Sequence, residues 1–189
     1  MRVQIAPSHS QDMMQCVAVP ITLEVVRPEG AAALADLKGK TFVETFAEDN
    51  DPAHVEAHRA RKFTPAAVER SLKDERSTTW WLLDDGVPVG FLKVNRGEAQ
   101  TEPDLDDGLE VEQIYILASH HGQGLGGRLI KHAITTAKVE GSPFIWLGVW
   151  ENNRKAIAVY EHLGFVPFGD HTFLFGDEEQ RDVLMRFDV

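Results

Sequence analysis

A glycine-rich stretch in the second half of the chain is the first candidate for chemistry. It reads HHGQGLGGRL over residues 120–129, after a strand-like apolar segment and before a segment with helical periodicity. Missing side chains let backbone N–H groups approach an anion closely, and the positive end of a helix dipole favours negative charge. The stretch therefore predicts a phosphate-binding loop, although glycines alone are equally typical of a flexible turn.

Two familiar phosphate-binding patterns fit this stretch poorly. A Walker A loop would need Lys and then Ser or Thr where the sequence has Gly127-Arg128-Leu129. The Rossmann pattern GxGxxG is met literally by Gly122, Gly124 and Gly127, with Glu151 near the distance expected for a ribose-binding acid. However, four residues separate the strand from the first glycine, and too little chain follows to complete a doubly wound sheet. A third phosphate-binding pattern fits the stretch better than either of these.

The third pattern is the acetyl-coenzyme A signature R/Q-x-x-G-x-G/A. It is met by His121, Gly122, Gln123, Gly124, Leu125 and Gly126. A second segment, ENNRKAIAVYEHLGF, follows one strand later and carries Asn153 and Tyr160, which a helix would place on one face two turns apart. Alone, Asn153 reads as a helix cap and Tyr160 as a core aromatic. Their occurrence together, downstream of the glycines, makes coincidence improbable.

Two acids occupy the strand-like segment LEVEQIYIL, residues 109–117. A period of two places Glu110, Glu112, Ile114 and Ile116 on one face of that strand. Either carboxylate could serve as a base or could be an ordinary solvent-facing strand residue.

Together these segments resemble the GNAT superfamily of N-acetyltransferases, and more closely the Pai-type spermidine/spermine acetyltransferases. The resemblance runs from about Ile21 to the end of the chain. Beyond the two coenzyme motifs it rests on KTFVETFAEDN, GFLKVN with AQTE after it, LEVEQIYIL, FIWLGVWENN and FGDHTFLFGDEEQRD. It implies an α/β (α+β) fold with a central mixed, mostly antiparallel sheet, splayed after the strand 109–117, and helices on both faces.

The resemblance also implies which residues contact acetyl-CoA. Tyr115 and Ile116 would offer backbone hydrogen bonds to pantetheine, and Asn153 and Lys155 would contact the coenzyme from the next loop and helix. The pyrophosphate would be held by His121, Gly122, Gln123, Gly124, Leu125, Gly126 and Gly127. Tyr160 would protonate the departing thiolate. One departure is His121, which stands where Arg or Gln is usual.

The chemistry implied is direct attack of an amine on the thioester. An amine with a pKa near 10 is protonated at neutral pH, so a base is needed. Glu112, through water, is the first candidate and Glu110 the second. Tyr160 keeps its proton at neutral pH and can act as the acid, and a backbone N–H near Leu117 could meet the oxyanion.

The elements around these motifs alternate between strands and helices. Patterning predicts helices over 30–46, from Thr64 onward, from the glycine stretch onward and over 153–163. Strands are expected at 20–27, 109–117 and 144–150, with a hairpin about Asp85-Gly86, an irregularity at Pro88 and a terminal antiparallel pair. A long acidic turn covers 97–108.

Length, composition and charge limit the domain organisation, the location and the partners of the protein. The 189 residues suit one domain, expected at 20–189 behind an extension of residues 1–19, and the single cysteine leaves no CxxC zinc site, so no metal is expected. No segment reads as a signal peptide or spanning helix, which favours a cytoplasmic protein without membrane partners. A net charge of −11 argues against nucleic acid and is compatible with a cationic substrate such as a polyamine.

Several alternatives stay open at this point. The acceptor could be a protein amino terminus, an aminoglycoside or another small amine, because a fold does not choose its acceptor. A coenzyme-binding regulator without turnover is a further alternative, since Pai-type proteins carry a regulatory association. A homodimer is compatible with the sequence.

Overall fold

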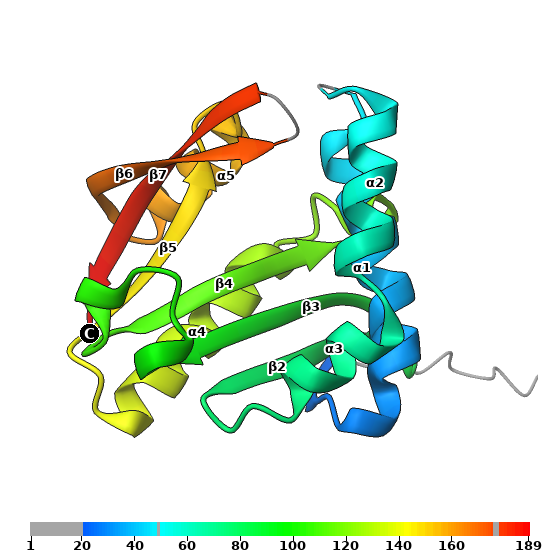
Figure 1. Cartoon of the computed structure of the whole chain (residues 1–189). Helices are drawn as coiled ribbons and strands as arrows, with labels where there is room; N and C mark the ends of the chain where they lie inside the picture. Colours follow the sequence, from blue (N-terminus) through cyan, green and yellow to red (C-terminus); the bar gives the residue numbers. More distant parts are fainter. Residues whose placement is uncertain (1–20, 49, 176–177) are drawn as a thin grey trace, which may run out of the picture.

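The computed structural model describes residues 21–48, 50–175 and 178–189 of the chain (Figure 1). The extension expected at residues 1–19 lies outside them. Within the described residues, no helix combines the length and apolar character needed to span a membrane.

Seven strands and five helices make up this part of the chain, joined by short 3-10 turns. In chain order they are β1 (Thr22–Val25), α1 (Ala31–Phe46), α2 (Pro52–Lys62), α3 (Pro65–Leu72), β2 (Ser77–Asp84), β3 (Val87–Arg96), β4 (Leu109–Ile116), η4 (Ala118–His120), α4 (Leu125–Glu140), β5 (Phe144–Trp150), α5 (Arg154–His162), β6 (Val166–Phe175) and β7 (Glu178–Asp188). The acidic stretch 97–108 contains two of the 3-10 turns.

The strands form one open sheet in the order β1-β2-β3-β4-β5-β7-β6, and every neighbouring pair is antiparallel except β4 with β5. Among the described residues, that parallel pair is joined only at Leu109 with Ile145 and at Glu110 with Trp146. Beyond these residues the two strands diverge, and Figure 1 shows a wedge between β4 and β5. The mostly antiparallel, splayed sheet predicted from the sequence is confirmed.

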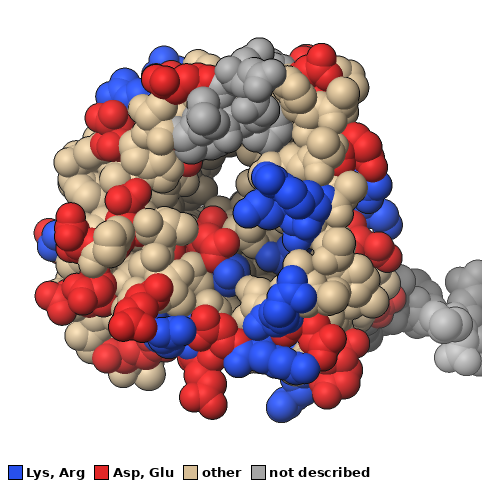
Figure 2. Space-filling model, in the orientation of Figure 1, with Lys and Arg blue, Asp and Glu red and all other residues tan. Residues whose placement is uncertain are grey.

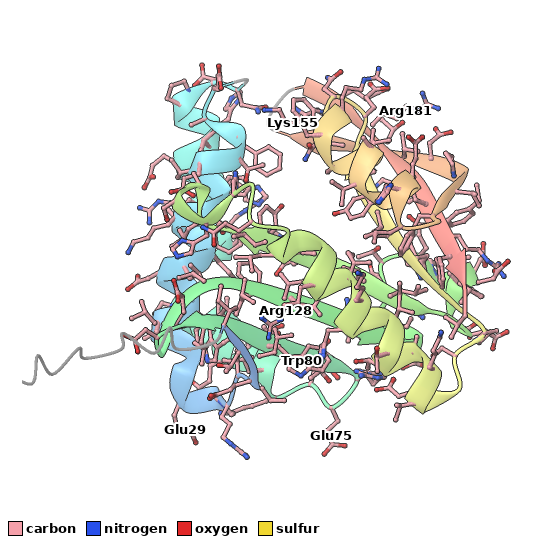
Figure 3. The ribbon with its side chains drawn as sticks, turned by 180° about the vertical axis from the view of Figure 1, so that it is seen from behind. Glu29, Glu75, Trp80, Arg128, Lys155 and Arg181 are labelled. Carbon is pink, nitrogen blue, oxygen red and sulfur yellow. The ribbon has the colours of Figure 1, made fainter. Side chains whose placement is uncertain are left out.

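Helices cover both faces of the sheet. On one face α1 packs on β3 and β4, and α3 packs on α1 and β2, with Leu34, Val68 and Phe91 in a shared core. Figure 3 shows α4 and α5 on the other face of the sheet. There α4 buries Leu129, and α5 adds Tyr160 to the same core. Leucine and alanine at helical spacing in α4 therefore anchor the glycine stretch against the sheet.

The strand β4 contains an irregularity that the sequence did not reveal. Lys93 of β3 pairs with Gln113, but the next residue, Val94, pairs with Val111, so Glu112 is an extra residue in β4. Such a β-bulge reverses the alternation of side chains beyond it. Val111 and Ile114 consequently pack on the α4 side. The expectation that Glu110 and Glu112 share a face with Ile114 and Ile116 is therefore wrong.

Local signals elsewhere were read correctly, with one omission. The Asp85-Gly86 turn has positive φ at both residues, 49° and 74°, as a two-residue hairpin requires, and the pairing shifts opposite Pro88. Thr64 caps α3 by accepting from the Ala67 N–H at 3.2 Å. The helix α2 was missed because it is mostly polar and buries only Val55.

Candidate active site

The glycine stretch forms an open cradle at the start of α4. Gly122 and Gly124 have φ of 76° and 73°, and a Cβ at either position would meet nothing within 4 Å. The helix ladder begins with the Arg128 N–H donating to the Gly124 carbonyl at 3.2 Å. The N–H groups of residues 125–127 precede that ladder, so they are oriented for an anion at the helix amino terminus. This geometry fits a pyrophosphate.

Two contacts fix the connection between β4 and this cradle. The Nε2 of His121 lies 2.7 Å from the carbonyl oxygen of Ile116, and the Ala118 N–H donates to Oε2 of Glu44 on α1 at 2.8 Å. The imidazole of His121 therefore binds the end of the strand, whereas the backbone of the following glycines faces outward. Arg or Gln is usual at this position, and in this chain the side chain of His121 helps to hold the loop.

The open edge of β4 offers backbone groups to a ligand. The Leu117 N–H donates to the Val89 carbonyl of β3 at 2.9 Å, so it is not available for an oxyanion. Since successive N–H groups of a strand point to opposite edges, Ile116 and Ile114 direct theirs toward the wedge and Tyr115 directs its own toward β3. The geometry thus favours Ile114 and Ile116, in place of Tyr115, as backbone partners of pantetheine.

A cavity of about 410 Å³ lies in this wedge. It collects side chains from α1, α2, β3, β4, β5, α5 and β7. Four of the residues predicted for the site line it, namely Glu112, Tyr115, Asn153 and Tyr160. Within the described residues, the lining does not include Glu110, Lys155 or the glycine stretch, so the cradle lies outside this cavity.

Glu110 is a structural carboxylate in this arrangement. It is 3% exposed, accepts from the Thr101 N–H and hydroxyl at 3.1 and 2.5 Å, and accepts from the Asn95 amide at 2.9 Å. Burial raises the pKa of Glu110, and the hydrogen bonds from Thr101 and Asn95 oppose that rise. Its oxygens tie the acidic loop to β4, and Glu110 does not line the cavity.

The pKa of Glu112 is shifted in the opposite direction to that of Glu110. Its Oε2 lies 2.5 Å from Nζ of Lys93 and accepts from the Asn95 amide at 2.7 Å. Burial alone would raise the pKa of Glu112, but Lys93, Asn95 and then Lys38 together lower it below its usual value. The bulge turns this ionised carboxylate into the cavity.

Two tyrosines face the same space. Tyr160 of α5 is 8% exposed, and burial, followed by the proximity of Tyr115, raises its pKa. Tyr115 stacks on Phe91 with ring centroids 5.6 Å apart, and burial, then Asp182 and Glu112, raise its pKa to about 12. Both hydroxyls keep their protons at neutral pH.

The start of α5 carries the remaining predicted residues. The Asn153 side chain accepts from the Ala156 N–H at 3.1 Å, so it caps the helix while also lining the cavity. Lys155 is exposed, and Figure 3 shows it at the end of α5 that borders the wedge.

Sequence reasoning missed the cavity's other charged residues, because no motif marks them. Lys38 and Lys62 enter from α1 and α2, and Asp182 enters from β7. Burial raises the pKa of Asp182, with His171, whose Nε2 is 4.0 Å from its carboxylate, opposing the rise. Within the described residues, His, Cys, Asp and Glu side chains form no cluster of three that could hold a metal ion.

Comparisons with known proteins agree with this geometry. Residues 33–165 match the family model of the acetyltransferase (GNAT) family. An uncharacterised N-acetyltransferase from the pepI 3′ region of Lactobacillus delbrueckii subsp. lactis is 32% identical over 147 residues, which are 78% of this chain and 85% of that protein. Thialysine N-epsilon-acetyltransferase from Sus scrofa is 32% identical over 77 residues, covering 39% of this chain and 45% of its own.

Among solved structures, the PaiA N-acetyltransferase from Thermoplasma acidophilum, in complex with coenzyme A, superimposes with a TM-score of 0.72 at 16% identity, over 90% of this chain and all of that one. The likeness in this case concerns the fold. A splayed sheet with a glycine cradle at the head of its central helix defines an acetyl-CoA-dependent acyltransferase. The chain belongs to the GNAT acetyltransferase family.

Proposed function

We propose that the protein transfers the acetyl group of acetyl-CoA to a primary amine by direct attack, within the cavity between β4 and β5. The observation that carries this proposal is the meeting of Glu112 and Tyr160, from separate sequence segments, in one cavity beside the open edge of β4. A carboxylate and a protonated phenol in one partly enclosed space are the two groups that amine acetylation requires.

The coenzyme end is assigned to three segments. The cradle His121–Gly127 binds the pyrophosphate through backbone N–H groups, the β4 edge at Ile114 and Ile116 pairs with pantetheine, and Asn153 and Lys155 contact it from the start of α5. Bound acetyl-CoA supplies the activated thioester that the amine attacks.

The acid and base roles follow from protonation states. Glu112, held ionised by Lys93 and Asn95, accepts a proton through water from the ammonium group of the acceptor, and the neutral amine then attacks the thioester. The hydroxyl of Tyr160, whose pKa burial raises, donates a proton to the leaving sulfur. Glu110, already bound to Thr101 and Asn95, positions the strand and takes no proton.

Thiol release from acetyl-CoA, measured across a panel of primary amines, tests this proposal. Glu112→Gln should lower kcat/KM for every accepted amine by about 10²- to 10⁴-fold while coenzyme affinity is retained. Glu110→Gln is the matched control and should keep the rate. Tight coenzyme binding with no thiol release from any amine would instead support a coenzyme-binding regulator.

A polyamine is the acceptor that the sequence resemblance favours. The acids of residues 44–51, which could attract a polycation, contribute little to the cavity. Glu44 binds the Ala118 N–H, and Asp51 caps α2 through the Ala53 N–H at 2.7 Å. Asp49 lies outside the described residues. Within the cavity, Glu112 and Asp182 are the groups that would attract a polycation. Spermidine and spermine therefore belong in the panel, with a peptide and an aminoglycoside beside them.

The remaining expectations concern the protein's surroundings. A homodimer and a cytoplasmic location stay predictions of the sequence. Light scattering of the purified chain with and without acetyl-CoA would measure the oligomeric state, and fractionation of the cells that make it would measure the location.

A further inference from the structure

A buried lysine of α1 lines the cavity. Lys38 of α1 is 7% exposed, its Nζ donates to Oε1 of Gln113, and it lies 4.9 Å from the centroid of the Phe91 ring. In the part of the chain that the structure describes, no carboxylate oxygen lies within 4.0 Å of this Nζ. Burial, and then Lys93, lower the pKa of Lys38 to about 8, with Glu112 opposing the change.

The carboxylate nearest to Lys38 is already engaged. Glu112 has Nζ of Lys93 at 2.5 Å and the Asn95 amide at 2.7 Å. The group of Lys38, Lys93 and Glu112 therefore carries one surplus positive charge in a buried location. Such a charge is costly unless a ligand supplies the missing anion.

The charges of the cavity are also unevenly distributed. Lys38 and Lys62 both enter from the α1 and α2 side, whereas Glu112 and Asp182 come from β4 and β7. Figure 2 looks into the hollow and shows Lys and Arg side chains on its α1 and α2 side. An acceptor with its amine near Glu112 would direct its other end toward the lysines.

We propose that the acceptor carries a carboxylate as well as its primary amine, and that Lys38 and Gln113 bind that carboxylate. The Oε1 of Gln113 accepts from Lys38, which leaves the Nε2 amide of Gln113 free to donate beside the ammonium group. Two donors side by side match the two oxygens of a carboxylate. This assignment rests on the amine acetyltransferase activity proposed above and specifies its substrate class.

The same arrangement disfavours polycations. The distal ammonium group of a diamine or of spermidine would lie against Lys38 and Lys62 in a space partly closed to water, where like charges repel more strongly than in solution. Aromatic rings of the α1 and α2 wall, Phe42 and Phe63 at 5.4 Å between centroids, suit an aliphatic or aromatic body between the two charged ends of the acceptor.

The test compares acceptors that differ only at the far end. Thiol release is measured for a series of ω-amino acids, for the alkylamines and diamines of the same length, and for spermidine. We expect the amino acids to exceed the alkylamines in kcat/KM by about 10-fold or more, and the diamines to be poorest. The carboxylate could belong to a free amino acid or to the carboxyl terminus of a peptide. Assays with free amino acids and with short peptides distinguish these two acceptors.

Variants then assign the preference to the lysine. Lys38→Met should lower kcat/KM for amino acids by about 10- to 100-fold more than it lowers kcat/KM for alkylamines of the same length, so that the preference disappears. Lys40→Met, on an exposed turn of the same helix, should keep it. Gln113→Leu provides a second route if Lys38→Met folds poorly, and it should weaken the same preference.

Three outcomes separate the hypotheses. Equal or better turnover of diamines and spermidine than of amino acids would overturn the carboxylate site, although the acetyltransferase activity would stand. An equal loss for all acceptors in Lys38→Met would likewise reject it and make Lys38 structural. No thiol release from any amine would refute the activity itself.

Discussion

Nζ of Lys93 and Oε2 of Glu112 lie 2.5 Å apart where β3 faces the bulge of β4. This pair, with Asn95 and Lys38, reverses the rise in pKa that burial would give Glu112. Removing the Lys93–Glu112 ion pair with Lys93→Met should therefore raise the pKa of Glu112. As the pH is lowered, protonation of Glu112 should then reduce activity at a higher pH than in the wild type. The acidic limb of kcat/KM against pH measures this.

The control for that change is Lys73→Met, which breaks an exposed ion pair of 2.6 Å with Glu69 on α3. It should leave the profile unchanged. Superimposable profiles for the wild type and Lys93→Met would show that Glu112 is not the titrating base.

Tyr160→Phe removes one hydroxyl from a buried side chain of the cavity. Without the acid, kcat should fall by about 10²-fold while coenzyme affinity is kept, because the ring still packs near Phe165. Tyr115→Phe removes a hydroxyl from the same cavity and should cost much less. Wild-type kcat with a lowered Tm would make Tyr160 a core residue only.

Gly124→Asp places a carboxylate in the cradle at the start of α4. Coenzyme A affinity, measured by calorimetry, should fall by about 10-fold or more, because the new carboxylate and the pyrophosphate are both negative and repel each other at close range. Gly141→Asp is the matched control, since Gly141 also has a positive φ, 75°, with nothing within 4 Å of a Cβ, at the other end of the helix. Equal affinities in the two folded variants would reject the cradle.

Glu110 should matter for stability and not for chemistry. Glu110→Ala leaves the Thr101 N–H without its acceptor and the Asn95 amide with Glu112 alone, which costs about 1–3 kcal/mol of unfolding free energy in urea melts. Glu110→Gln can satisfy the same donors and should be close to wild type in stability. A loss of kcat in folded Glu110→Gln would return Glu110 to the list of bases.

The lowered pKa of Lys38 predicts that the free energy of unfolding rises with pH. Burial, and then Lys93, lower the pKa of Lys38 to about 8 in the folded protein, against an ordinary value of 10.5. Between these values the unfolded chain binds more protons than the folded chain, so the free energy of unfolding should increase with pH through that window. Lys38→Met should remove this part of the increase. Parallel pH dependences of the two proteins in urea melts would contradict the lowered pKa.

The fold was predictable because its signals are local. The Asp85-Gly86 turn, the Thr64 cap and the leucines of α4 each specify their element from neighbouring residues. The sequence indicates a candidate site where a motif marks it, as in the glycine stretch and at Asn153 and Tyr160. Sequence reasoning also proposed Glu112 as the base, and the structure places it in the cavity.

The rest depended on three-dimensional context. The LEVEQIYIL alternation carries no sign of the bulge, which arises from pairing with β3 and changes the face of every later residue in β4. Lys38 and Asp182 are far apart in the sequence and reach the same cavity only because α1 and β7 lie on opposite sides of the wedge. No spacing rule links such residues.

The divergence of β4 from β5 also gives the protein an intrinsic reporter of occupancy. Because the two strands pair only at Leu109 and Glu110 among the described residues, the amide protons of Ile114 and Ile116 face solvent rather than a neighbouring strand. Their deuterium exchange should be fast in the free protein and slow once pantetheine supplies acceptors. Exchange rates at these two amides would then follow coenzyme residence directly, even in variants that no longer turn over.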